Sequence, residues 1–174
     1  MQQLVAALAF AAHKHRDQRR KDANASPYIN HPIALAQLLV NEGGIDDERV
    51  LTAAVLHDTV EDTETTPAEL EKLFGRQVMA IVLEVTDDKT LLKHERKRLQ
   101  IEHAAGLTRE AKLVKLADKI CNLRDMAHHP PAGWSRERRL EYFDWAKAVV
   151  DNLRGVHPGL ERLFDKAFQG RQRV

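Results

Sequence analysis

Residues 53–62 read Ala-Ala-Val-Leu-His-Asp-Thr-Val-Glu-Asp, an apolar run followed at once by four groups that can bind a metal or carry a proton. On a helix, Glu61 would lie one turn beyond His57, and Asp62 one turn beyond Asp58. Such crowding of negative charge is unfavourable unless a cation neutralises it or the carboxylates face water. A solvated acidic helix end is the plain alternative. The apolar residues favour a metal site, because they carry the helix into the interior just before His57 and buried polar groups need partners.

Apolar residues recur at helical spacing along the rest of the chain, and no segment alternates as a strand would. Pro32 suits the first position of a helix, and Thr66-Pro67-Ala68-Glu69 is typical of an N-cap, a first-turn proline and a capping-box glutamate. The expected helices cover residues 4–12, 32–43, 46–57, 67–75, 76–85, 90–105, 109–127, 136–153 and 158–168. The sequence therefore predicts an all-α fold, a bundle of about eight or nine helices in one domain over residues 1–174.

Composition narrows the class of protein. A chain of 174 residues with 43% hydrophobic side chains suits one domain with a proper core. Lys and Arg number 27 against 26 for Asp and Glu, so the net charge of +1 gives no overall attraction to nucleic acid or membrane. Cys121 is the single cysteine, which excludes an internal disulfide and fits a reducing compartment. The apolar N-terminal stretch is too short to span a bilayer, so we expect a cytoplasmic protein.

Two distant segments can complete a metal site. The Pro-Tyr-Ile-Asn-His-Pro stretch of residues 27–32 puts His31 at the mouth of the second expected helix, and Asp118 and Asn122 lie one turn apart beside the apolar stripe of a later one. Singly, a capping histidine or a surface aspartate explains each of these residues. Together, two nitrogen and two oxygen ligands suit Mn²⁺, Fe²⁺, Co²⁺ or Zn²⁺ better than Mg²⁺. The proposed ligands are His31, His57, Asp58 and Asp118.

The order of these residues, H…HD…D, resembles the HD-domain superfamily of metal-dependent phosphohydrolases. The likeness is closer still to the hydrolase domain of the RelA/SpoT alarmone enzymes, and most of all to the small stand-alone metazoan SpoT homologues and their bacterial relatives. It extends in order from about residue 4 to about residue 168. The segments that carry it are Gln18–Lys21, Pro27–Pro32, Leu56–Asp62, Val85–Lys89 and Lys115–Asp125.

The resemblance implies an HD-domain helical bundle with Mn²⁺-dependent activity that removes the 3′-pyrophosphate of (p)ppGpp, giving GDP or GTP and pyrophosphate. It implies that His31, His57, Asp58 and Asp118 hold the metal, and that Glu61 and Asp62 position or deprotonate the attacking water. It places Arg20, Lys21, Asn122 and Tyr142 at the substrate. Asp125 is a departure, because the long bifunctional members commonly carry a small hydroxyl residue there. Because the segments that resemble the hydrolase domain extend over nearly the whole chain, we expect no synthetase module.

Other interpretations remain open from the sequence. Metal ligands interact only with the phosphate group of a substrate and do not distinguish one nucleotide from another. The substrate could therefore instead be a deoxynucleoside monophosphate or the 2′-phosphate of NADPH. A further alternative is a non-catalytic module that senses a nucleotide. Residues 19–21, Arg-Arg-Lys, suit either a solvated helix end or an anion site. The charged run of residues 93–98 suits an exposed helix face. The aromatic residues Trp134, Tyr142, Phe143 and Trp145 are more typical of core than of a nucleobase platform.

Overall fold

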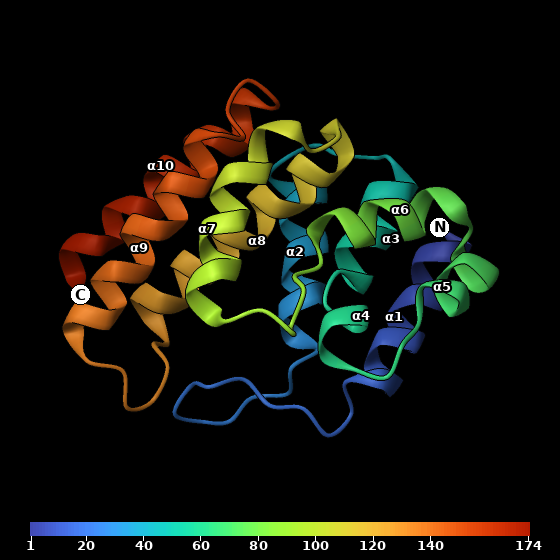
Figure 1. The fold of residues 1–174 in the computed structure, drawn as a ribbon, viewed down its shortest axis with the longest axis horizontal. Coiled ribbons are helices and arrows are strands. Elements are labelled where there is room, and N and C mark those ends of the chain that lie inside the picture. The colour runs from blue at the N-terminus through green and yellow to red at the C-terminus, as the bar shows by residue number, and fades with distance from the viewer.

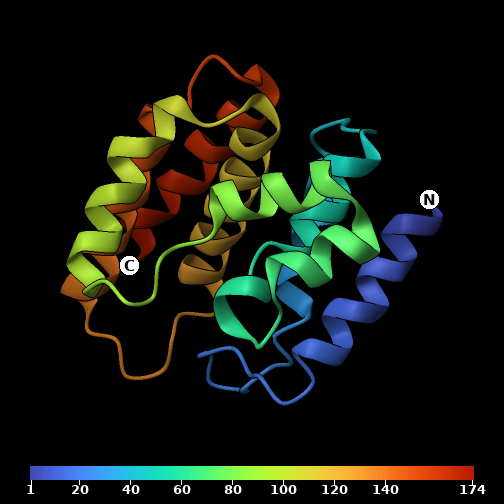
Figure 2. The same cartoon turned by 45° about the vertical axis from the view of Figure 1, so that its right-hand side comes forward.

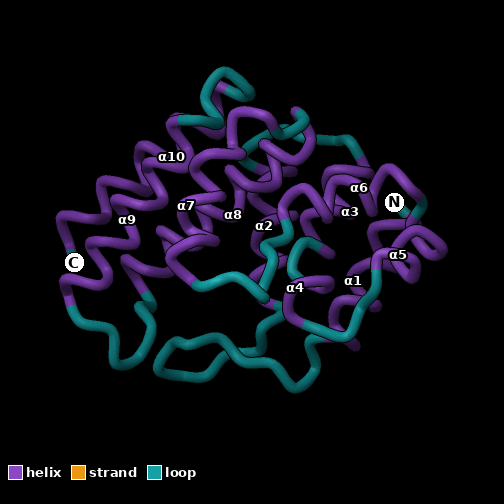
Figure 3. The backbone as a smooth tube through the Cα atoms, viewed as in Figure 1, coloured by secondary structure: helices purple, strands orange, loops and turns teal.

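The computed structural model describes residues 1–174 as ten α-helices and two short 3₁₀ helices, without strands (Figures 1 and 3). The helices are α1 Gln2–Lys14, α2 Asn30–Asn41, α3 Glu48–Leu56, α4 Thr59–Asp62, α5 Pro67–Phe74, α6 Arg76–Val85, α7 Lys93–His103, α8 Arg109–His128, α9 Arg136–Asp151 and α10 Pro158–Phe168, with the 3₁₀ helices η1 Ala104–Gly106 and η2 Gln169–Arg173. The all-α expectation is confirmed, with nine helices of eight residues or more and the one-turn α4. No helix has both the length and the apolar character needed to span a membrane.

Helix α8 lies in the middle of the molecule. It packs against α2, α3, α6, α9 and α10, so most of its circumference is covered. The N-terminal helices α1, α5 and α6 lie on one side of it and the C-terminal helices α9 and α10 on the other (Figure 1). A single cluster of 35 buried hydrophobic residues runs through these contacts, and the core is therefore continuous. A residue on α8 can reach the interior from either side.

The helices begin at residues that favour a helix start, and two expectations, one for α5 and one for α2, need correction. Asp47 caps α3 by accepting from the Arg49 amide, and Thr66 caps α5 by accepting from the Glu69 amide. The capping-box role of Glu69 is not seen, because its carboxylate pairs with Lys14 instead. Helix α2 begins at Asn30, two residues before the expected Pro32. Proline is tolerated there because the amides of the first helical turn have no partner within the helix.

The chain bends between α3 and α4, so α3 ends at Leu56, one residue before its expected end, and Glu61 and Asp62 lie on the separate one-turn helix α4. Asp58 has φ −101° and ψ 0°, and the Thr59 hydroxyl donates to the Leu56 carbonyl oxygen at 2.7 Å, next to where the helix stops. Adjacent side chains on a helix do not face each other. At this bend they do, since His57 Nε2 lies 2.9 Å from Asp58 Oδ2. The bend therefore turns two neighbouring residues toward one centre.

Two loops lie along the same edge of the molecule in both views (Figures 1 and 2). One is residues 15–29, between α1 and α2, and the other is residues 129–135, between α8 and α9. They are joined by a hydrogen bond of 2.7 Å from the Ala132 amide to the Lys21 carbonyl oxygen. Together they form the rim of the large cavity described below.

Candidate metal centre and adjoining cavities

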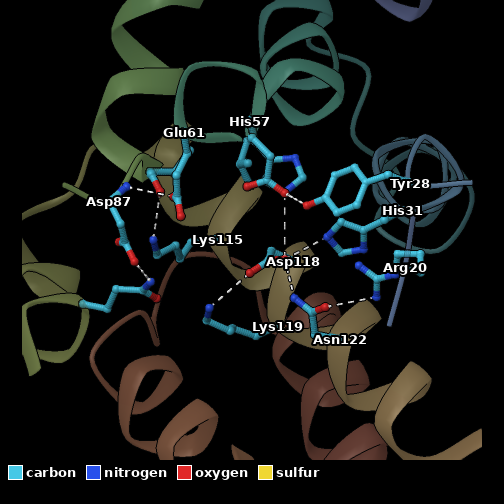
Figure 4. A pocket seen from close by; sticks show the side chains of 14 residues that line it. Arg20, Tyr28, His31, His57, Glu61, Asp87, Lys115, Asp118, Lys119 and Asn122 are labelled. Atoms are coloured by element: carbon cyan, nitrogen blue, oxygen red, sulfur yellow. Dashed lines mark hydrogen bonds and ion pairs between the residues drawn. The ribbon is translucent and has the colours of Figure 1, made fainter. Parts of the chain in front are cut away.

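Three of the four expected metal ligands come together from three parts of the chain. His31 lies in the first turn of α2, His57 at the bend after α3, and Asp118 in the middle of α8, and each offers a ligand atom within 4.8 Å of the others (Figure 4). The two imidazole rings meet edge to face, with centroids 5.3 Å apart. Asp58 joins this group through its contact with His57. The expected ligand set thus forms one cluster, with Asp58 at its edge.

The hydrogen bonding of the His57 ring indicates that this cluster of side chains suits a bound cation. Its Nδ1 lies 2.8 Å from the Ala54 carbonyl oxygen, which can only accept, so the proton sits on Nδ1. Nε2 is buried without a hydrogen-bond partner, although Asp58 Oδ2 lies 2.9 Å away and Asp118 Oδ1 4.0 Å away. A bare nitrogen lone pair facing two carboxylates is stable only with a positive charge between them. Two imidazoles and two carboxylates suit a divalent transition metal there.

Without a metal, a proton supplies that charge. Burial alone would lower the pKa of His57, but the charges of Asp58 and Asp118 outweigh it and raise the pKa to about 9. Burial likewise works against the ionised form of Asp118, yet Lys119 and His31 hold the pKa of that carboxyl well below its usual range. Metal and proton therefore compete for His57, as expected of a metal ligand.

Asp118 is fixed by its neighbours on α8 and α2. Its Oδ1 accepts from Asn122 Nδ2 at 2.5 Å and lies 3.1 Å from His31 Nε2, and its Oδ2 accepts from Lys119 Nζ at 3.1 Å. Asn122, predicted to contact substrate, thus also orients a metal ligand. Its carbonyl oxygen accepts from Arg20 Nη2 at 3.4 Å, which links the centre to the loop of residues 15–29.

Asp58 is oriented by Tyr28, whose hydroxyl donates to its Oδ2. Partners of this kind that orient a metal ligand typically contribute about 10- to 100-fold to metal affinity. We therefore expect Tyr28→Phe to weaken binding of Mn²⁺ by roughly that factor while the protein stays folded. Isothermal titration with Mn²⁺ measures it, and Tyr142→Phe, the other tyrosine of the chain, should bind as the wild type does. Unchanged affinity in Tyr28→Phe would mean that the hydroxyl has no orienting role.

The two carboxylates predicted to act on water point to different places. Glu61 lines the same small cavity as the metal ligands, and its Oε2 accepts from the Asp87 amide at 3.0 Å. Burial, together with the charge of Asp58, raises the pKa of Glu61 to about 7. Asp62 instead faces the outer cavity and is bound by Gln18 Nε2, at 3.0 Å, and by Lys89. Only Glu61 thus lies in the cavity of the expected metal ligands, and the catalytic roles of both Glu61 and Asp62 stay predictions.

The segment Val85–Lys89, a motif without an assigned role, holds both carboxylates. Its Asp87 amide binds Glu61, and its Lys89 ammonium binds Asp62. The Asp87 side chain is held in turn by Gln100 Nε2 of α7 at 2.7 Å. The motif therefore positions Glu61 and Asp62, the two carboxylates that were predicted to act on water.

Two adjoining cavities meet at the metal centre. The inner one, of about 150 Å³, is lined by the metal ligands, Glu61 and a set of polar side chains. The outer one, of about 720 Å³, lies between α8, α9 and the two rim loops. Both are lined by Arg20, Tyr28, His31 and Asn122. Small-molecule pockets commonly measure about 300–1,000 Å³, so the outer cavity can hold a nucleotide and the inner one only a smaller group.

The residues expected at the substrate all line the outer cavity. Arg20 is partly buried and its Nη2 donates to Asp125 Oδ2 at 2.6 Å, so the residue that departs from the long family members is an ion-pair partner. Lys21 is exposed on the rim. Tyr142 lies between Trp134 and Trp145, with ring centroids 6.1 and 5.3 Å away. Burial raises the pKa of Tyr142, so its hydroxyl stays protonated.

The charged run of residues 93–98 is only partly solvated. Arg98 is exposed and pairs with Glu102, as expected of an outer face. Lys97 Nζ, in contrast, lies 5.0 Å from the Trp145 ring centroid, and Lys93 Nζ lies 5.8 Å from that of Trp134. The core interpretation of the aromatic residues holds for Phe143, which is fully buried, whereas the other three are only partly buried.

Sequence reasoning missed the buried lysines of the inner cavity, Lys115 and Lys119. A signal was present, since Lys115, Lys119 and Asn122 follow one another at helical spacing along the strip that carries Asp118. Lysine is rarely buried without a partner, however, so residue type alone gives no reason to expect these two side chains inside.

Comparison with known proteins identifies the family to which the chain belongs. The HD domain family matches residues 7–144. MESH1 of Xenopus tropicalis, a guanosine-3′,5′-bis(diphosphate) 3′-pyrophosphohydrolase, is 58% identical over 95% of this chain and 92% of its own, and human MESH1 is 57% identical over 97% and 94%. A solved structure of a metazoan orthologue of SpoT that hydrolyses ppGpp has a TM-score of 0.95 and 53% identity, covering 99% of this chain and 97% of its own. The chain therefore belongs to the HD-domain family and, within it, to the metazoan SpoT homologues.

Proposed function

We propose that this protein is a metal-dependent hydrolase, a single domain over residues 1–174, that removes the 3′-pyrophosphate of guanosine tetra- and pentaphosphate. The observation that carries the proposal is a cation-fitting centre placed between a nucleotide-sized cavity and a carboxylate with a pKa of about 7. The relatives named above, similar along nearly their whole length, are hydrolases of this substrate.

His31, His57, Asp58 and Asp118 would hold the metal, for which we propose Mn²⁺. A bound divalent ion offsets phosphate charge and makes water more acidic. Glu61 takes a proton from the attacking water, whose oxygen forms a bond to the phosphorus attached to the ribose O3′. The bond between that phosphorus and O3′ breaks, and O3′ leaves with a proton from solvent or a neighbouring acid. The products are GDP or GTP and inorganic pyrophosphate, with one water consumed.

The outer cavity would hold the nucleoside. Arg20 and Lys21 supply positive charge where the net charge of the chain does not, and Arg20 also lies over the Tyr28 ring, 5.8 Å from its centroid. Asn122 stands between the two cavities, next to the scissile bond in this arrangement. Tyr142 offers an aromatic face and a protonated hydroxyl to the nucleoside.

The experiment is a substrate panel with and without Mn²⁺. Guanosine tetraphosphate, guanosine pentaphosphate, NADPH and deoxynucleoside monophosphates are incubated with the protein, and the products are separated by ion-exchange chromatography. We expect release of pyrophosphate from the guanosine substrates that stops when the metal is chelated. Efficient hydrolysis of another substrate without pyrophosphate release would replace the proposal. Tight binding of the tetraphosphate without turnover with any divalent ion would favour the sensor.

The pH dependence follows from Glu61. Its carboxylate form accepts the proton, so kcat/KM should rise with pH until Glu61 is ionised and then level off. Because the pKa of Glu61 is about 7 and a bound cation favours the ionised form, we expect the midpoint of this rise at or below pH 7. Initial rates at about ten pH values between pH 5 and 9 locate this midpoint. A profile that rises only above pH 8 would exclude Glu61 as the base.

A further inference from the structure

Two lysine side chains lie at the inner end of the small cavity, away from the nucleoside side. Lys115 and Lys119 are one turn apart on α8, and only 7% and 3% of their surfaces are exposed. Both line the inner cavity, with Lys115 toward Glu61 and Asp87 and Lys119 toward Asp118 (Figure 4). The proton transfer described above uses neither ammonium group, and the metal centre uses only that of Lys119, which donates to Asp118.

Lys119 has partners that account for its burial. Its Nζ donates to Asp118 Oδ2 at 3.1 Å and lies 4.3 Å from the centroid of the Trp145 ring. The ammonium is therefore matched by a carboxylate and an aromatic face. Its position next to a metal ligand is enough to explain why it is buried.

Lys115 has no such match. Its only hydrogen bond goes to the Val85 carbonyl oxygen at 3.1 Å, and no carboxylate oxygen lies within 4.0 Å of its Nζ. An ammonium carries three donors, so two of them are directed to the cavity or its walls. A buried charge is costly unless it is paired, and burial together with the charge of Lys119 lowers the pKa of Lys115. An anion in the inner cavity would supply the missing partner.

The placement of the substrate in the proposed reaction indicates which anion would bind beside Lys115. The oxygen that leaves belongs to the nucleoside, which needs the larger, outer cavity. The attacked phosphorus lies at the metal centre, where both cavities share Arg20, His31 and Asn122. The second phosphate of a 3′-pyrophosphate therefore points away from the nucleoside, into the inner cavity. Lys115 and Lys119 line that end of it.

We propose that Lys115, with Lys119 beside it, binds the terminal phosphate of the 3′-pyrophosphate, so that the inner cavity selects a pyrophosphate over a single phosphate. This inference rests on the proposed function for its choice of substrate. Val85, Gln100 and Asp87 complete the wall, and Gln100 Oε1 is buried without a partner, so this carbonyl oxygen can accept from a bound water or from a protonated phosphate oxygen. The same subsite would hold inorganic pyrophosphate as product.

The test compares Lys115→Gln with the wild type, and Lys112→Gln, one turn earlier on α8 and outside both cavities, is the control. Titration calorimetry with the Mn²⁺-loaded protein measures binding of inorganic pyrophosphate and of inorganic phosphate. Hydrogen bonds to charged groups correspond to roughly a 10- to 100-fold change, so we expect that loss for pyrophosphate in Lys115→Gln. Phosphate binding should change less than about twofold, because it needs only the metal. Lys115→Arg should recover most of the loss.

Kinetics give an independent measure. The ratio of kcat/KM for guanosine 5′-diphosphate 3′-diphosphate to that for guanosine 5′-diphosphate 3′-monophosphate should fall by about tenfold or more in Lys115→Gln and stay unchanged in Lys112→Gln. An equal loss for both compounds, or unchanged pyrophosphate binding, would overturn the subsite. If Lys115→Gln does not fold, Lys115→Met replaces it, because its apolar chain suits a buried position.

The two proposals fail separately. Wild-type protein that releases no pyrophosphate from the tetraphosphate would refute the proposed function. Wild-type protein that does release it, with Lys115→Gln equally selective, would refute the subsite alone.

Discussion

Replacing Glu61 with Gln is expected to lower kcat by about 10²- to 10⁴-fold while the metal stays bound. Glutamine has the same shape and its carbonyl oxygen can still accept from the Asp87 amide, so the wall of the inner cavity is kept. It cannot accept the proton of the attacking water. Because the polar partners of Glu61 are the Asp87 amide and Arg96, and none is a proposed metal ligand, the loss should appear in kcat and in the pH profile, where the rise with pH disappears.

Stopped-time assays of pyrophosphate release, with metal content from elemental analysis on the same samples, measure both effects. Glu64→Gln is the matched control, because Glu64 lies three residues further on and is exposed beside Lys14. It should keep wild-type kcat. A Glu61→Gln protein with wild-type kcat would remove Glu61 from the mechanism, and one that had lost its metal would assign it to the metal centre instead.

The fold was predictable because its signals are local. The apolar spacing of α8 and the cap Thr66 act within one or two turns of the chain, and the structure confirms them. The end of α3 near His57 was expected, whereas the turn that brings Asp58 against His57 was not, since it depends on Asp58 leaving the regular helical geometry. Propensity alone does not encode such a bend, because tertiary contacts can override it.

The gathering of His31, His57 and Asp118 was predictable from residue type and from the family pattern. The contacts of the residues that surround these three were not predictable. The ion pair of Arg20 with Asp125 joins residues 105 positions apart, and nothing in either segment names its partner. The burial of Lys115 depends likewise on α6 and α7, whose contacts the sequence of α8 does not contain.

Asp118→Asn should be the most damaging change to the metal centre. It removes one of two negative charges that face His57, and it comes from a different helix than the other ligands, so no neighbour can replace it. Changes to residues that only orient a ligand typically cost about 10- to 100-fold in metal affinity, and loss of a charged ligand should exceed that. We therefore expect Mn²⁺ affinity to fall by more than about 100-fold, with kcat/KM falling in parallel at limiting metal.

The variant should nevertheless fold, because asparagine has the same shape and its single carbonyl oxygen can still accept from Asn122, although Lys119 then loses the second oxygen that Asp118 offers it. Metal that binds the folded state alone raises the melting temperature, so Mn²⁺ should stabilise the wild type and leave Asp118→Asn unchanged. Asp144→Asn, at an exposed ion pair with Arg171, is the control and should respond as the wild type does. An Asp118→Asn protein that keeps its full metal content would show that the two histidines and Asp58 suffice, and would leave Asp118 as the partner of His31 and Lys119 alone.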